Sequence, residues 1–134
     1  MAQPQGNSST TGGRIDGSVG TALSAADTAF ALGAGWGTTA TFAVAAGSTD
    51  QRGIITITSS GTGQAQATAN VTLTFKDGAY AATPVAIVTL QSSSNAVTES
   101  QPTQVTQTTT TASWRHSVLP VAAATYRFAY VVIA

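Results

Sequence analysis

The chain contains no cysteine and very few charged residues. Without cysteine, none of its 134 residues can form a disulfide or a thiolate metal site. Aspartate, glutamate, lysine and arginine make up 7% of the chain, compared with about 25% in typical soluble domains. The formal net charge is zero, so the chain as a whole carries no field that would attract nucleic acid or an anionic membrane.

Long apolar runs and catalytic motifs are missing as well. No apolar run approaches the roughly 18 residues of a membrane-spanning helix, so we expect no insertion into a membrane. His116 is the only histidine, whereas a zinc site needs three or four protein ligands. The sequence has no GxSxG motif and no phosphate-binding loop. We therefore predict a protein that is not an enzyme and binds no cofactor or metal, with His116 at the surface or in an interface.

Threonine is abundant, whereas large aliphatic side chains are scarce. About two dozen threonines favour β-structure, because a β-branched side chain packs well on a pleated sheet. A domain of this size buries only about two-thirds of its surface on folding. We expect the thin core to be completed by other copies of the chain, in a homo-oligomer and specifically a trimer.

Alternation of apolar and polar residues predicts strands along most of the chain. In residues 126–134, for example, Tyr126, Phe128 and Tyr130 fall on one face of a strand. Turns rich in glycine, serine and aspartate separate such segments at intervals near the roughly 8–12 residues typical of sandwiches and barrels. The other predicted strands are residues 40–46, 53–59, 67–76, 85–91 and 103–113. The pattern predicts an all-β fold, namely an antiparallel, jelly-roll-like β-sandwich of six to eight short strands.

One predicted strand is unusually apolar, and one segment before the strands is ambiguous. Residues 85–91, VAIVTLQ, are almost entirely apolar, which predicts a central strand or one that is buried on both faces. Residues 21–33 fit two structures. Leu23 and Phe30 could line one side of a helix, with residues 24–27 as a weak capping box, whereas the neighbouring glycines favour an extended segment.

Asp50 and Arg52 lie in one predicted turn between two strands. They fit either a pair that stabilises this turn or an ion pair between subunits. The sequence alone leaves both interpretations open.

The two ends of the chain differ in composition. Residues 1–20 are polar and rich in glycine, with almost no large apolar side chains, so they cannot by themselves offset the entropy of ordering. We therefore divide the chain into an N-terminal arm and linker, residues 1–34, and a β-sandwich domain, residues 35–134. We expect the arm to anchor the domain to a larger particle. The residues expected to make these contacts are Gln3, Pro4, Arg14, Ile15 and Val19.

Three aromatic residues are candidates for an interface or for binding a ligand. Trp36 lies in a glycine-rich hinge, GAGWG, where its ring could close one end of the sandwich or stack on a sugar. Tyr80 and Trp114 are the other two rings that could stack on a glycan. If they do, their faces must be accessible to solvent.

Most of the chain resembles a small β domain found in virion surface proteins of bacteriophages. The resemblance rests on "GAGWGTTATFAVAAGSTDQRGIITITSSG", "ANVTLTFKDGAYAATPVAIVTL" and the closing "TYRFAYVVIA". These segments follow the order of such domains: a glycine-rich entry, an "AGSTDxxG" turn between two strands, "VTLTFxDGxYxxxP" and a terminal aromatic strand. Similar domains lie at the ends of minor tail proteins and tail fibres.

The resemblance implies a non-enzymatic module on the exterior of a phage particle. A short chain with a polar arm fits a capsid decoration protein or head-fibre subunit that attaches to the major capsid protein or a tail protein. The alternative is the tip domain of a tail fibre or minor tail protein, which would bind a receptor or glycan on the host surface.

Overall fold

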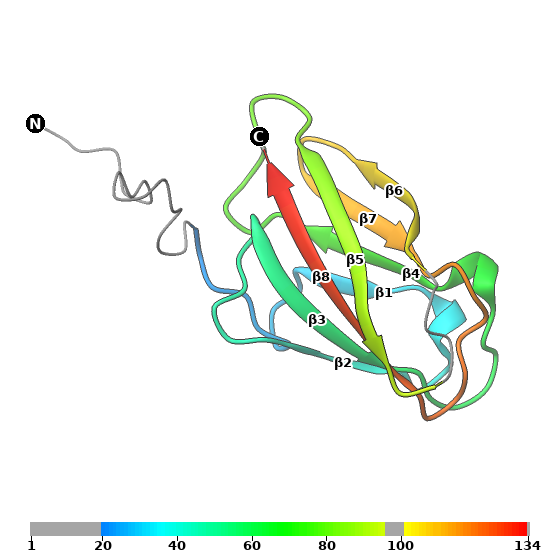
Figure 1. The fold of residues 1–134 in the computed structure, drawn as a ribbon. Helices are drawn as coiled ribbons and strands as arrows, with labels where there is room; N and C mark the ends of the chain where they lie inside the picture. Colours follow the sequence, from blue (N-terminus) through cyan, green and yellow to red (C-terminus); the bar gives the residue numbers. More distant parts are fainter. Residues whose placement is uncertain (1–19, 96–100, 134) are drawn as a thin grey trace, which may run out of the picture.

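Two four-stranded antiparallel sheets stack face to face in the computed structural model, which describes residues 20–95 and 101–133 (Figure 1). One sheet, here called the β8 sheet, has the strand order β2-β3-β8-β5. Its strands are Thr41–Val44 (β2), Arg52–Thr58 (β3), Val85–Ser93 (β5) and Thr125–Ile133 (β8). The other, the β7 sheet, has the order β1-β4-β7-β6. Its strands are Phe30–Leu32 (β1), Asn70–Thr74 (β4), Thr103–Gln107 (β6) and Thr111–Arg115 (β7). The predicted all-β sandwich is confirmed.

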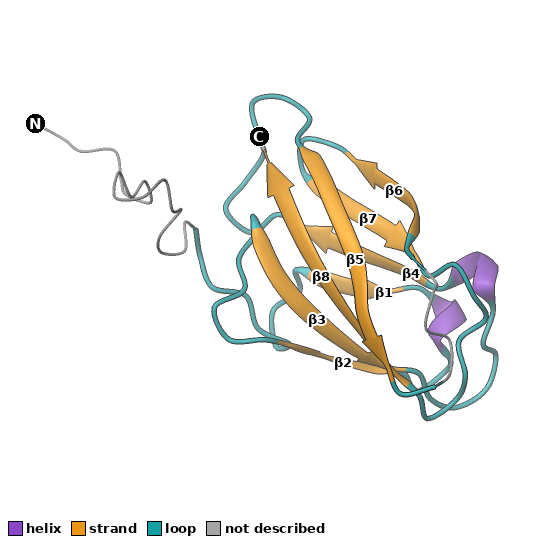
Figure 2. Ribbon diagram, viewed as in Figure 1, coloured by secondary structure: helices purple, strands orange, loops and turns teal. Residues whose placement is uncertain are grey.

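The chain passes repeatedly between the sheets. Only β2–β3 and β6–β7 are consecutive strands that pair with each other, and every other connection crosses from one sheet to the other. Two short 3₁₀-helices, Ala34–Trp36 (η1) and Gln66–Thr68 (η2), lie close together at one end of the sandwich (Figure 2). Because the crossings bring together strands that are far apart in sequence, the core depends on long-range contacts.

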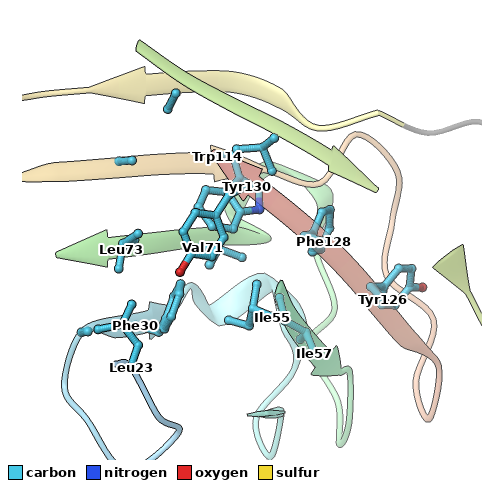
Figure 3. Close-up of a cluster of buried hydrophobic side chains, with 14 of the residues drawn as sticks. Leu23, Phe30, Ile55, Ile57, Val71, Leu73, Trp114, Tyr126, Phe128 and Tyr130 are labelled. Atoms are coloured by element: carbon cyan, nitrogen blue, oxygen red, sulfur yellow. The ribbon is translucent and has the colours of Figure 1, made fainter. Parts of the chain in front are cut away.

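The core fills the space between the two sheets. Strand β8 lies between β3 and β5, and its inward residues Tyr126, Phe128, Tyr130 and Val132 are all buried. Figure 3 shows Tyr130 beside Trp114 of the β7 sheet. The ring centroids of Trp114 and Tyr130 lie 6.1 Å apart with a 28° interplanar angle. The period-two pattern of the closing strand therefore gave the correct buried face.

Glycines allow η1 to pack against the chain around η2. A Cβ atom on Gly35 would lie 2.1 Å from the carbonyl oxygen of Ala65, closer than any side chain could approach. Gly37 adopts a φ of +106°, which disfavours residues with a side chain. These two glycines place Trp36, which stands between them, in the core with no exposed surface.

Several of residues 20–34, which the sequence assigned to the arm and linker, are part of the sandwich. Leu23 is buried in the core, and β1 pairs with β4. Residues 21–24 are irregular and residues 25–29 form turns, so no helix forms here, although the Asp27 carboxylate accepts a hydrogen bond of 2.7 Å from the Ser24 amide, as in a capping box. The sandwich therefore begins before residue 35, where the sequence placed its start.

The prediction that residues 85–91 are central or buried on both faces is wrong. Strand β5 forms one edge of the β8 sheet, because it pairs only with β8. Its side chains alternate: Ala86 and Val88 are buried against the core, whereas Val85 and Ile87 are exposed. A strand this apolar is normally covered on both sides, but this sandwich has only two layers and covers one.

Candidate functional site

The outer face of the β8 sheet carries a cluster of exposed aliphatic side chains where β5 begins and β8 ends. Val85 lies directly across from Ile133, and Ile87 directly across from Val131. The exposed fraction is 58% for Val85, 54% for Ile133, 54% for Ile87 and 44% for Val131. Paired side chains on one sheet face contact each other, so these four residues form a continuous surface, here called the apolar patch.

Few charges lie near the apolar patch. The next pair along β5 and β8, Thr89 and Ala129, is uncharged, and the next outward residue of β8 is Arg127. On β3, Arg52 lies across from Val131, on the side of β8 away from β5. The patch is thus apolar toward the sheet edge, with Arg52 at its inner border and Arg127 farther along β8.

Two of the three candidate aromatics are enclosed in the core. Trp36 is 0% and Trp114 is 1% exposed. The indole nitrogen of Trp36 donates a hydrogen bond of 2.9 Å to the carbonyl oxygen of Asn70, and its ring stacks on His116 at 5.5 Å. Neither ring can offer a face to a sugar in this fold. For Trp36, the interpretation as a residue closing the end of the sandwich agrees with its position.

Tyr80 is half-buried. Its ring meets Phe75 edge to face, with centroids 4.8 Å apart. Burial raises the pKa of its hydroxyl, with smaller contributions from Asp50 and Asp77. The segment is held to the β6–β7 turn by a backbone hydrogen bond of 2.8 Å from Tyr80 to Thr109. Of the three candidate rings, Tyr80 alone keeps some access to solvent.

His116 lies in the core, so its predicted place at the surface or in an interface is wrong. It has no exposed area, and its ring is 4.7 Å from that of Tyr126. Within the described residues, neither ring nitrogen has a hydrogen-bond partner. Burial lowers the pKa of this imidazole to about 4. The sequence contained a signal for this position, because His116 continues the alternation of Ala112 and Trp114 on β7.

The predicted anchoring residues Gln3, Pro4, Arg14, Ile15 and Val19 lie outside the described residues. The described chain begins beside a polar cluster at one end of the sandwich. The Asp77 carboxylate accepts a hydrogen bond of 2.7 Å from the Thr21 amide. Lys76 forms an ion pair of 2.8 Å with Asp27, and this bond is the main reason that the pKa of the Asp27 carboxyl is lowered. These contacts fix where the chain enters the sandwich.

Asp50 is buried in the turn between β2 and β3. One of its carboxylate oxygens accepts a hydrogen bond of 2.7 Å from the amide of Asp77. The segment is further held by Tyr130, whose hydroxyl donates a bond of 2.6 Å to the carbonyl oxygen of Thr49. Asp50 therefore joins the β2–β3 turn to the turn after β4.

A hollow of about 380 Å³ lies on the β7 sheet and is here called the polar hollow, because five of its six lining residues have polar side chains. Hydroxyl groups of Thr106 and Ser113 lie 2.7 Å apart beside it, and Gln104 adopts a φ of +50° where the β6–β7 register is irregular. The residues that line it are Asn70, Thr72, Gln104, Thr106, Ser113 and Trp114. Their carboxamides and hydroxyls could form hydrogen bonds with an uncharged ligand.

Comparisons with known proteins do not assign this chain to a family. It matches no protein-family model, no curated protein and no solved structure. Within residues 20–95 and 101–133, no three histidine, aspartate or glutamate side chains gather in a group that could hold a metal. The same residues include no helix that is long and apolar enough to cross a membrane.

Proposed function

We propose that this chain is a non-enzymatic structural protein on the exterior of a bacteriophage virion, as a capsid decoration or head-fibre subunit. The proposal combines the resemblance of residues 35–134 with the apolar patch, which is the observation that carries it. A sheet face with four half-exposed aliphatic side chains is typical of a surface that other proteins cover. Low charge adds to this, because a chain with 7% charged residues and no net charge is poorly soluble alone.

In this proposal the arm and the sandwich have separate tasks. Residues 1–19 bind the major capsid protein or a tail protein, while the sandwich remains outside the shell. Stable interfaces between proteins bury about 1,600 Å² in total. Such added area across neighbouring capsid subunits strengthens the shell. The subunits act as homo-oligomers, with a trimer as the predicted form.

Removing residues 1–19 should abolish attachment and leave the domain folded. The described strands and core all lie after this segment, so circular dichroism and the midpoint of thermal unfolding should match those of the full chain. Attachment is measured by adding each purified protein to virions of the encoding phage made without this chain and sedimenting the particles. Full-length protein should pellet with the virions, and the truncated protein should stay in solution.

Two results would contradict the proposal in different ways. If the truncated protein sediments with the particles as well as the full chain does, the arm is not the anchor. If virions purified from cells infected with the encoding phage lack the chain in mass spectrometry, the proposed location is wrong.

The polar hollow on the β7 sheet favours a second candidate, a tail-fibre tip that binds a host glycan. Uncharged hydrogen-bonding side chains such as Asn70 and Gln104 suit a neutral sugar. In that case, Gln104→Ala should weaken binding to a glycan array at least about tenfold, because the ligand loses a hydrogen bond. Thr89→Val, on the outer face of the other sheet, is the control. An array without signal for the full chain excludes this candidate.

A further inference from the structure

The apolar patch is the place where the sequence pattern and the single folded chain disagree most. Strand β5 has the composition of a strand buried on both faces, yet Val85 and Ile87 are more than half exposed. We propose that a second copy of this chain supplies the missing cover by docking on the apolar patch. This inference deepens the proposed function, on which it rests, by naming the surface through which the subunits associate.

The shape of the patch suits a second sheet. Its four side chains come from two adjacent strands in two direct cross-strand pairs, so they stand on one sheet face. Sheets bury such faces by packing against another sheet at about 10 Å. The other exposed aliphatic residues, Leu119 and Val121, lie in the loop between β7 and β8 and have no such strand partner.

Charge favours a second copy over a partner of strong charge. Strand β5 contains no charged residue, and the only one in β8 is Arg127. Two copies of a neutral face meet without repulsion, whereas a basic or acidic partner would lose hydration and find no opposite charge here. The patch therefore offers no charge that would repel a second copy.

The two bordering arginines do not prevent this contact. Arg127 is four residues from Val131 along β8, which corresponds to about 13 Å. A two-fold axis that crosses the strands at the patch sends the two copies of Arg127 to opposite ends of the interface. The other arginine, Arg52, lies on β3, on the side of β8 away from the edge of the sheet where the contact forms. A contact centred on Val85 and Ile87 leaves its long side chain at the rim of the interface. A two-fold pair and a three-fold ring can both bury the patch, and the measured mass distinguishes them.

Sedimentation equilibrium of the full-length protein between about 1 and 100 µM tests the inference. The unmodified chain should have a mass of two or three times 13.4 kDa. Ile87→Lys places a charge in the contact of each copy and should raise the dissociation constant at least about a hundredfold. Leu119→Lys is the matched control, because Leu119 has a similar exposed fraction of 53%. If Ile87→Lys fails to fold, Ile87→Thr takes its place. This variant keeps a β-branched residue on β5 and should also weaken association.

Single cysteines give an independent measurement, since the chain has none of its own. Under mild oxidation, Ile87→Cys, at the centre of the contact, should form a disulfide between copies far faster than Leu119→Cys. The inference is overturned if the unmodified chain is a monomer at 100 µM, or if Ile87→Lys and Ile87→Thr associate like the unmodified chain. It is also overturned if the two cysteine variants cross-link at equal rates. These measurements use no virions, so the proposed location on the phage can fail while the self-association stands.

Discussion

Replacing Trp36 with alanine should lower the free energy of unfolding by about 3–5 kcal/mol. The ring has no exposed surface and packs against His116, Tyr126 and Phe128. Its loss leaves a cavity between the sheets and removes the hydrogen bond to the carbonyl oxygen of Asn70. In a domain of this size the midpoint of thermal unfolding should fall by more than about 10 °C, as measured by circular dichroism.

The matched control is Leu119→Ala, which removes an exposed side chain from a loop. Its effect should stay within about 0.5 kcal/mol. The comparison separates the two interpretations of Trp36 from the sequence. If Trp36→Ala unfolds within a few degrees of the unmodified protein, the ring does not hold the core together, and the packing described above is wrong.

Stability should fall by about 3 kcal/mol as the pH is lowered from about 6.5 to about 4, because of His116. Burial lowers the pKa of the folded state to about 4, whereas an unfolded histidine titrates near pH 6.5. The unfolded chain therefore binds more protons in this range, and protonation favours unfolding. Stability from this group is complete above about pH 6.5 and is lost toward pH 4. Urea unfolding at several pH values measures it.

The control for this pH dependence is His116→Phe, which keeps an aromatic ring next to Trp36 but cannot be protonated. Between pH 6.5 and 4 its free energy of unfolding should change far less than that of the unmodified chain. The test compares how steeply the free energy of unfolding changes with pH, so it holds even if the larger phenylalanine ring changes stability at pH 7. His116 is the only histidine, and carboxyl groups with lowered pKa values, such as Asp27 and Asp77, act at lower pH. An equal slope in both proteins would contradict the assignment to His116.

Strand positions were easiest to predict where one face is buried and the other is wet. Strand β4 illustrates this, because Val71 and Leu73 are buried while Asn70 and Thr74 are exposed. The alternation comes from the pleat itself and needs no knowledge of neighbouring strands. Strand β1 was missed because it has only three residues and is held by pairing with β4, a partner about 40 residues later in the chain.

The candidate site was not predictable in the same way. A run such as that of β5 shows that its side chains are apolar but not which of them the sheets will cover. The patch exists because Val85 and Ile87 are paired with Ile133 and Val131 at the edge of a sheet. Likewise, the exposure of Trp114 depends on the sheet opposite β7, which the sequence does not describe.

The sequence by itself determined that this is an all-β sandwich of short strands with a polar N-terminal segment and little charge. Those properties follow from local alternation, turn residues and composition, which act over a few neighbouring residues. Alternation places Trp114 and His116 on one face, but only the tertiary structure decided that this face is enclosed and that one side of β5 is bare. Burial depends on which distant strands pair and on how many layers stack, and these are contacts between segments that no local pattern specifies.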